Sequence, residues 1–384
     1  MENTIYLDYA ATTPVEPSVL EAMLPYFKER FGNASSAYSL GAQSRKAVER
    51  ARCRVADLLN AMGPGEIFFT SGGTESDNWA LSGAACANRE HGNHIITTPI
   101  EHHAVLASAH WLERAGFEVT LLPVDSFGMV DPDDLRKAIR SNTTIISIMH
   151  ANNEIGTIQP IADLAKVAHE HGILFHTDSV QTVGKIPVDV RAFGVDLLSI
   201  SGHKLYGPKG IGALYIKNGV TLDPLISGGG QEKSMRGGTY NVPGIVGIGK
   251  ACELAKDYLN TEIARQQAMR DNLIDSVLNT IPDSRLNGHP TLRLPHNAHF
   301  AFKSIEGSAL VANMEAMGVY CSAGSACSSG ATSASHVLTA IGLPSDWVRG
   351  TVRMTLGKPT TSSDIQNAAK ALAHSVSNLR RLKI

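Results

Sequence analysis

Between about residues 44 and 260, short apolar runs alternate with segments whose apolar residues recur at helical spacing. This alternation constrains the fold more than any other feature, because strands that alternate with helices build a mainly parallel sheet. The apolar runs are 66–70, 94–98, 119–123, 144–149, 173–177, 196–201 and 212–216. The amphipathic segments between them include 45–59, 104–115, 133–139 and 161–171. The sequence therefore predicts an α/β fold with a mainly parallel, seven-stranded sheet flanked by helices.

The rest of the chain predicts a second, smaller α+β domain. Residues 246–280 contain no proline and are typical of one or two long helices. A polar linker (282–297), a strand (298–303), a helix (307–317), a loop of small residues (322–335), a strand (350–356) and a terminal helix (362–382) are expected to follow. We expect residues 14–258 to form the large domain. Residues 1–13 and 259–384 should form the small one.

Composition and charge exclude several classes of function. Of the 384 residues, 43% are hydrophobic and 18% are charged, which is typical of a soluble globular protein. A formal net charge of -2 gives no general attraction to nucleic acid or to anionic lipid, so neither is an expected partner. No run of eighteen apolar residues is present, and the first residues do not have the pattern of a secretory signal, so neither a spanning helix nor secretion is expected. The five cysteines form no C-x-x-C pair, which favours free thiols in the cytoplasm and no metal site.

Candidate ligand-binding residues follow the predicted strands, because ligands of such sheets bind at the carboxyl ends of the strands. Lys204 comes just after the run 196–201, beside His203, where it could form a Schiff base with a carbonyl cofactor. By itself it could equally be a surface lysine. Asp178 follows the run 173–177 and could pair with the pyridine nitrogen of pyridoxal phosphate, while Gln181 could bind the ring oxygen. Asp178 could also simply cap a helix.

A phosphate site is predicted at the turn 70–76, which joins an apolar run to a helical segment. Gly73 and its neighbouring glycine expose backbone N–H groups at the positive end of a helix, and Thr74 adds a hydroxyl. The turn lacks the glycine fingerprint of dinucleotide sites and is not a P-loop. A plain tight turn is the alternative. Two more runs are followed by His102, which could stack on a cofactor ring, and by Asn153, which could bind its oxygen.

Together these motifs resemble the cysteine desulfurases of the NifS/IscS type, within the aspartate-aminotransferase fold (fold type I) of pyridoxal-phosphate enzymes. The resemblance covers nearly the whole chain. Its motifs are 6–14 (YLDYAATTP), 31–33 (FGN), 74–76 (TES), 101–102 (EH), 152–154 (NNE), 176–178 (HTD), 201–204 (SGHK) and 325–327 (SAC). Their order and spacing, more than any single motif, make the resemblance specific.

The resemblance implies a role for each matching residue. Lys204 would hold pyridoxal 5'-phosphate covalently, Asp178 would pair with the pyridine nitrogen, and His102 would stack on the ring and assist proton transfer. The remaining cofactor-binding residues would be Gly73, Thr74, Gln181, Ser201, His203 and, from the second subunit of a homodimer, Thr239. The substrate-binding residues would be Asn33, Asn153 and Arg353, with Arg353 gripping the carboxylate of L-cysteine at two points.

Cys327 distinguishes a desulfurase from its relatives. It lies in the segment 322–335, whose small side chains predict a flexible loop, and by itself it could be an ordinary linker cysteine. The resemblance implies that Cys327 takes sulfur from L-cysteine as a persulfide, leaves L-alanine, and delivers the sulfur to an iron–sulfur scaffold or another acceptor protein. Cys321 is expected to be a buried apolar residue. Relatives with this long loop usually have Leu-Glu-Pro where this chain has residues 332–334 (TSA). The identity of the acceptor protein that docks there therefore stays open.

Three alternatives stay open at this point. The same fold could carry a selenocysteine lyase or β-lyase, or an aminotransferase. It could also carry a catalytically idle scaffold for sulfur transfer, because a fold alone does not determine a function.

Overall fold

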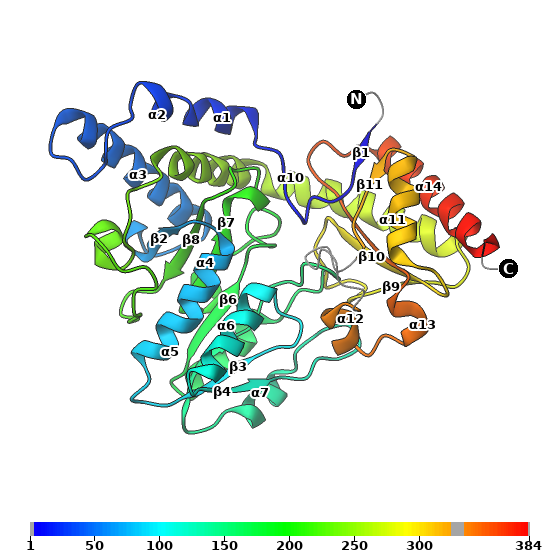
Figure 1. Ribbon diagram of the computed structural model, residues 1–384, viewed down its shortest axis with the longest axis horizontal. Helices are drawn as coiled ribbons and strands as arrows, with labels where there is room; N and C mark the ends of the chain where they lie inside the picture. Colours follow the sequence, from blue (N-terminus) through cyan, green and yellow to red (C-terminus); the bar gives the residue numbers. More distant parts are fainter. Residues whose placement is uncertain (1–3, 324–333, 383–384) are drawn as a thin grey trace.

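A mixed sheet of seven strands forms the centre of the larger of two lobes (Figure 1) in the computed structural model, which describes residues 4–323 and 334–382. The strand order is β2-β8-β7-β6-β5-β3-β4. Neighbours from β7 to β4 run parallel, whereas β8 runs antiparallel to both β7 and β2. The strands are β2 (Ile67–Thr70), β3 (His94–Thr97), β4 (Glu118–Leu121), β5 (Thr143–Ser147), β6 (Leu174–Asp178), β7 (Leu197–Ser201) and β8 (Gly212–Ile216). The predicted fold class, a mainly parallel seven-stranded sheet, is confirmed.

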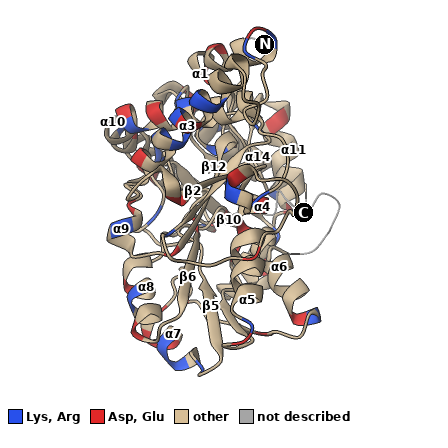
Figure 2. Cartoon of the chain, turned by 90° about the vertical axis from the view of Figure 1, so that its left-hand side faces the viewer, with Lys and Arg blue, Asp and Glu red and all other residues tan. Residues whose placement is uncertain are grey.

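Helices cover both faces of this sheet, which explains its unbroken apolar runs. Every residue of β3, β5, β7 and β8 is buried, as is expected of strands in a sheet whose two faces are both covered. Figure 2 shows α7, α8 and α9 on one side of the strands and α5 and α6 on the other. The helices of the large lobe are α1 (Pro17–Met23), α2 (Pro25–Lys28), α3 (Ser39–Leu58), α4 (Gly73–Asn78), α5 (Ala84–Ala87), α6 (His103–Arg114), α7 (Pro132–Ala138), α8 (Ile161–Glu170) and α9 (Val190–Phe193). Short 3₁₀ turns occupy Pro64–Glu66, Gly202–Lys204 and Gln231–Ser234, and a π-helical turn occupies Trp79–Gly83.

A single long helix, α10 (Val242–Thr280), runs from the large lobe into the small one (Figure 1). The predicted domain boundary at residues 258 and 259 falls inside this helix. No break in the backbone marks the boundary, and the division stays a prediction.

The small lobe contains a three-stranded antiparallel sheet, in the order β12-β10-β9, and a separate pair of strands, β1 and β11. The elements are β1 (Ile5–Tyr6), β9 (Ser284–Leu286), β10 (Asn297–Phe302), α11 (Gly307–Ala316), β11 (Val319–Tyr320), α12 (His336–Ala340), α13 (Ser345–Val348), β12 (Thr351–Thr355) and α14 (Ser362–Arg381). β9 lies inside the segment 282–297, which was predicted to be a linker without a strand. The sequence did not reveal this strand because its three residues are only half-buried and show no apolar alternation. The N-terminal segment reaches this lobe through the parallel pairing of β1 with β11.

Within residues 4–323 and 334–382, no helix combines the length and the apolar character needed to cross a membrane. The same residues hold no group of three or more His, Cys, Asp or Glu side chains arranged to bind a metal ion.

Candidate active site

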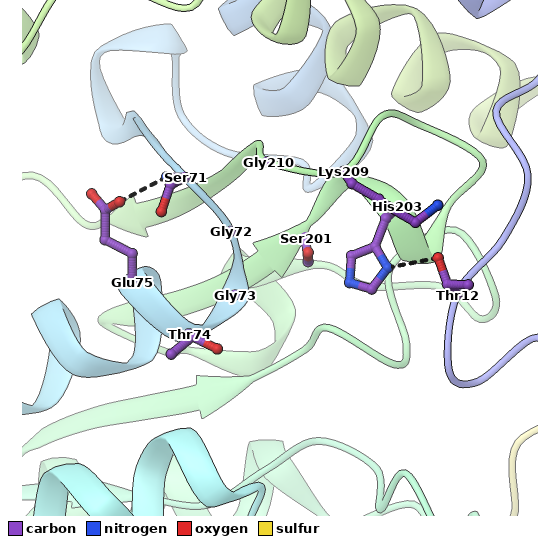
Figure 3. Close-up of a pocket in the computed structure, with 10 residues that line it drawn as sticks. All are labelled: Thr12, Ser71, Gly72, Gly73, Thr74, Glu75, Ser201, His203, Lys209 and Gly210. Atoms are coloured by element: carbon purple, nitrogen blue, oxygen red, sulfur yellow. Dashed lines mark hydrogen bonds between the residues drawn. The ribbon is translucent and has the colours of Figure 1, made fainter. Parts of the chain in front are cut away.

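A cavity of about 340 Å³ opens where β2 and β7 end, at the start of α4 (Figure 3). Its lining residues come from four separate segments: Thr12, Ser71, Gly72, Gly73, Thr74, Glu75, Ser201, His203, Lys209 and Gly210. Gly212 allows these segments to converge, because it pairs with both Thr70 and Ser201. A Cβ atom on Gly212 would lie 2.6 Å from the carbonyl oxygen of Ile200 and 2.7 Å from the carbonyl carbon of Gly72. The close packing of the turn on the sheet therefore requires glycine at position 212.

The groups facing this cavity suit a phosphate. Gly73 begins a helical run that continues without a break through Trp79–Gly83 and α5, so its N-terminal N–H groups face the cavity with a partial positive charge. Hydroxyls of Thr74 and Ser201 line the same space. His203 lines the cavity as well. The structure thus brings together four predicted cofactor-binding residues around the phosphate site: Gly73, Thr74, Ser201 and His203.

His203 is held in place by Thr12, for which the sequence analysis gave no role. The His203 Nδ1 atom lies 3.0 Å from the Thr12 hydroxyl oxygen (Figure 3). Burial, together with the charges of Lys204 and Lys209, lowers the pKa of His203 to about 4. The imidazole is therefore neutral at neutral pH, and Lys209 supplies a positive charge at the cavity wall. Only the position of Thr12 within the motif 6–14 could have suggested its role.

The Lys204 amine lies at the end of the turn after β7, within reach of the N-terminal segment. Its Nζ atom donates to the carbonyl oxygens of Ala10 at 2.6 Å and Ala11 at 2.7 Å. Gln181 donates from Nε2 to the same Ala10 oxygen at 3.0 Å. Residues 10 and 11 thus join two of the predicted cofactor-binding side chains. Backbone acceptors of this kind leave no trace in a sequence.

Asp178 ends β6 as a buried carboxylate, and its Oδ1 atom accepts a hydrogen bond from Val180 N at 2.9 Å. A turn follows it rather than a helix, so Asp178 caps no helix. Burial raises the pKa of Asp178, while the nearby charges of His102 and Lys204 oppose that rise. These three predicted site residues therefore interact electrostatically in one place. A cationic partner close to Asp178 would stabilise the ionised form of this buried carboxyl group.

His102 has a structural role that the sequence analysis did not foresee. Its Nδ1 atom accepts a hydrogen bond from Ala104 N at 3.1 Å and so caps the N-terminus of α6. In the neutral ring the proton then lies on Nε2. Burial lowers the pKa of His102 although Asp178 opposes the shift, which favours this neutral form.

Two further buried carboxyl groups, Glu101 and Asp77, lie near Asp178. Burial raises the pKa of Glu101 to about 8, and the charge of Asp178 adds to the effect. The pKa of Asp77 is also raised well above its usual value, first by burial and then by Asp178. Glu101 belongs to a motif that the sequence analysis quoted, but only the fold shows that both acids are buried beside a third.

The candidate substrate end of the site is built around Arg353 on β12. Its guanidinium donates to the carbonyl oxygen of Asn153 at 2.8 Å and to Asp8 Oδ1 at 2.7 Å. The Arg353 Nε atom is buried and has no hydrogen-bond partner among the described residues. Asn152 shapes the turn that carries Asn153, because its Oδ1 atom accepts from the backbone N–H groups of residues 154 and 155. The predicted pair of Asn153 and Arg353 is therefore in contact.

Comparison with known proteins places this chain in a family. Residues 5–368 match the model of the class-V aminotransferases. The chain belongs to the class-V aminotransferase family. It is 53% identical over 378 residues to the cysteine desulfurase IscS of Methanosarcina thermophila, an alignment that covers 98% of this chain and 93% of that protein.

Solved structures show the same relationship. A NifS-like protein superposes with a TM-score of 0.92 at 38% identity, covering 98% of this chain and 100% of the other. SspA in complex with cysteine superposes with a TM-score of 0.82 at 41% identity, covering 92% and 99% of the two chains. The resemblance to NifS/IscS-type proteins predicted from the motifs is confirmed.

Pyridoxal phosphate is the cofactor of the family's cysteine desulfurases, and the residues of this chain fit it. The 340 Å³ cavity offers phosphate-binding groups, Lys204 offers an amine, and Asp178 offers a buried carboxylate. All three come from the same edge of the sheet, where β2, β6 and β7 end.

Three predicted residues do not join this group. Thr239 is exposed and lines a neighbouring cavity of about 240 Å³, which shares Ser71 and Gly210 with the first. Asn33 lies in an exposed turn, where its Oδ1 atom accepts from Ser35 N at 2.9 Å. Cys327 lies outside the described residues. The roles predicted for these three stay predictions.

Proposed function

We propose that this chain is a pyridoxal-phosphate-dependent cysteine desulfurase that converts L-cysteine to L-alanine and keeps the sulfur on Cys327 as a persulfide. One observation carries the proposal. Both described ends of the segment that contains Cys327 are hydrogen-bonded to the structure around Arg353, the predicted carboxylate-binding residue. Full-length similarity to cysteine desulfurases supports the same reaction.

At its N-terminal end, Ser322 pairs with Arg353 in both directions: Ser322 N donates to Arg353 O at 3.1 Å, and Arg353 N donates to Ser322 O at 2.7 Å. At its C-terminal end, the Ser335 hydroxyl donates to Glu154 Oε2 at 2.6 Å, one residue beyond Asn153. Five residues span at most about 16–18 Å, so covalent geometry alone keeps Cys327 within that distance of Ser322. This limited reach from Ser322, which pairs with Arg353, supports Cys327 as the residue that takes the sulfur.

The residues of the chain divide the work as follows. Arg353 binds the substrate carboxylate with its guanidinium, and Lys204 links the cofactor and moves the proton at the substrate Cα atom. The bound cofactor supplies an electron sink beside that carbon. The Cys327 thiolate then bonds to the substrate sulfur as the C–S bond breaks. Sulfur stays on Cys327, and the carbon skeleton takes up protons to become alanine.

Two of the described cysteines, Cys252 and Cys321, are poorer candidates for this step. Burial raises the pKa of both Cys252 and Cys321 to about 12, so neither forms a thiolate readily near neutral pH. Asp8 adds to the shift at Cys321. The raised pKa values therefore argue against Cys252 and Cys321 as the sulfur acceptor.

The proposal extends to partners, location and domains. We propose a homodimer in which Thr239 reaches the phosphate site of the partner subunit, a role that suits its exposed position and the exposed Leu225 and Ile226 nearby in the sequence. Sulfur would pass to an iron–sulfur scaffold or another acceptor protein in the cytoplasm. Residues 14–258 would form the cofactor-binding domain, and residues 1–13 and 259–384 the small domain.

The deciding experiment compares Cys327→Ala with a matched control, Cys53→Ala, which changes an exposed cysteine. Purified holoenzyme is incubated with L-cysteine and a reductant, and alanine and sulfide are measured together. Cys327→Ala should keep the cofactor absorbance but lose almost all alanine formation, whereas Cys53→Ala should match the wild type. Near-normal turnover by Cys327→Ala would refute the role of this thiol.

Product analysis of the wild-type protein distinguishes the rival reactions. Pyruvate with ammonia would indicate β-elimination, and transfer of the amino group to a keto acid would indicate an aminotransferase. A lack of any product would indicate an idle scaffold. Lys204→Ala should abolish both the covalent cofactor link and the activity.

A further inference from the structure

Tyr206 stands out because it adopts a backbone conformation that bulky residues rarely adopt. Tyr206 lies two residues after Lys204. Its φ angle is +62°, and the residue is only 5% exposed. Hydrogen bonds to the N-terminal segment hold this conformation: Tyr206 N donates to Thr13 Oγ1 and Tyr206 O accepts from Glu16 N, both at 3.0 Å. Such conformations gather at functional sites, where surrounding contacts maintain them.

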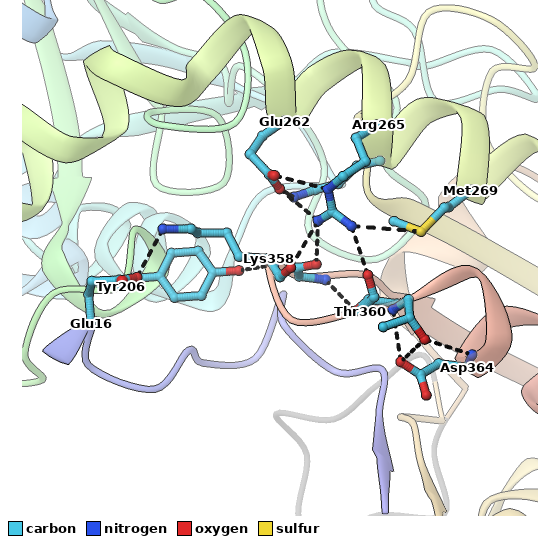
Figure 4. A network of polar contacts seen from close by, with 11 residues as sticks. Glu16, Tyr206, Glu262, Arg265, Met269, Lys358, Thr360 and Asp364 are labelled. Carbon is cyan, nitrogen blue, oxygen red and sulfur yellow. Dashed lines mark hydrogen bonds and ion pairs between the residues drawn. The ribbon is translucent and has the colours of Figure 1, made fainter.

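The Tyr206 side chain leaves the large lobe and reaches a backbone group of the small lobe. Its hydroxyl oxygen accepts a hydrogen bond from Lys358 N at 2.7 Å (Figure 4). Lys358 belongs to the turn 357–360, which follows β12 after one intervening residue and begins four residues after Arg353. The side chain of Tyr206 thus connects the turn of Lys204 to the strand of Arg353.

The turn that receives Tyr206 is itself held firmly. Arg265 on α10 donates to the carbonyl oxygens of Gly357 at 3.0 Å and Thr360 at 2.7 Å, and Glu262 pairs with Arg265 at 2.8 Å (Figure 4). A contact between two such anchored turns transmits position, because neither end can move without breaking further hydrogen bonds.

The surroundings of the ring also stabilise this link. Lys185 Nζ lies 4.7 Å and Lys358 Nζ 5.6 Å from the ring centroid, which is the range of cation–π attraction. Burial raises the pKa of Tyr206, so the phenol stays neutral and its oxygen remains available to the Lys358 N–H.

We propose that Tyr206 is a positioning residue whose hydroxyl couples the Lys204 turn of the large lobe to the Arg353 strand of the small lobe. The inference rests on the proposed function, in which one substrate molecule must meet Arg353 with its carboxylate and Lys204 with its Cα proton. These two groups belong to different lobes, so the lobes must keep a fixed relation during proton transfer. Small misplacements of reacting groups are costly to the rate.

The test is Tyr206→Phe in the holoenzyme, which removes the hydroxyl and keeps the ring. Alanine formation should show kcat lowered about tenfold with KM changed less than about twofold. The primary isotope effect on kcat with Cα-deuterated cysteine should rise, because proton transfer becomes slower. The cofactor absorbance and the Tm should stay close to those of the wild type.

Tyr258→Phe is the matched control. The Tyr258 ring also contacts Lys358, with Nζ 3.8 Å from its centroid, but its position on α10 is remote in sequence from the Lys204 turn. The control should behave like the wild type. An unchanged kcat and isotope effect in Tyr206→Phe, or an equal loss in Tyr258→Phe, would overturn the inference. If the wild type forms no alanine, the proposed function fails; if only Tyr206→Phe is normal, the inference alone fails.

Discussion

Replacing Glu101 with glutamine should remove a large loss of stability that the wild-type protein suffers as the pH rises. Glu101 is fully buried, and its Oε1 atom accepts from the Thr98 hydroxyl at 2.7 Å and from Met149 N at 3.0 Å. Its Oε2 atom has no hydrogen-bond partner among the described residues. Burial is the main cause that raises its pKa from 4.5 to about 8. Glutamine can keep the Oε1 acceptor but cannot ionise.

The sign of the effect follows from which state loses its proton first. In the unfolded chain Glu101 ionises near pH 4.5, whereas in the folded protein it stays protonated until about pH 8. The contribution of Glu101 to stability is therefore fully present below pH 4.5. It is lost as the pH rises from there through the folded pKa of about 8. At about 1.36 kcal/mol per pKa unit, the full loss approaches about 5 kcal/mol. Between pH 5.5 and 9 it should amount to about 3 kcal/mol.

Urea unfolding of the wild type and Glu101→Gln at pH 5.5, 7 and 9 measures this difference. The free energy of unfolding of the variant, relative to the wild type, should increase by about 3 kcal/mol across the series. Glu315→Gln is the control, since Glu315 is exposed on α11. Stability profiles that run parallel for the wild type and Glu101→Gln would refute the reasoning from burial.

Three further predictions concern single contacts. Arg353→Lys loses the two-pronged grip on a carboxylate and should lower kcat/KM for cysteine about 10–100-fold in steady-state assays; an equal kcat/KM would exclude that grip. Arg52→Leu leaves Glu232, now paired with Arg52 at 2.7 Å, as a buried charge without its cation; urea unfolding should show a loss of about 3–5 kcal/mol, and an unchanged midpoint would contradict it. Gly212→Ala should push Gly72 outward and weaken binding of pyridoxal phosphate about tenfold or more in titrations of the apoprotein; unchanged binding would show that the turn does not need glycine at position 212.

The sequence by itself determined the type of fold and the side chains with reactive chemistry. Apolar runs predict strands because a strand buried on both faces can hold few polar groups, and all seven predicted runs became strands of one sheet. Lys204, Asp178 and Thr74 could be found because they follow such runs directly. Local pattern is enough for these features, since it depends only on neighbouring residues. Local pattern was not enough for β9, because its three half-buried residues show no alternation of apolar and polar side chains.

Only the tertiary structure decided which remote segments meet. The Lys204 amine is held by carbonyl oxygens 193 and 194 residues earlier in the chain, and the Tyr206 hydroxyl by a backbone N–H 152 residues later. Every residue carries such backbone groups, so their identity cannot mark them in a sequence. The raised pKa of Glu101 likewise arises from its burial beside Asp178. Contacts of this kind exist only after the packing of the whole chain has brought distant segments together and excluded water from between them.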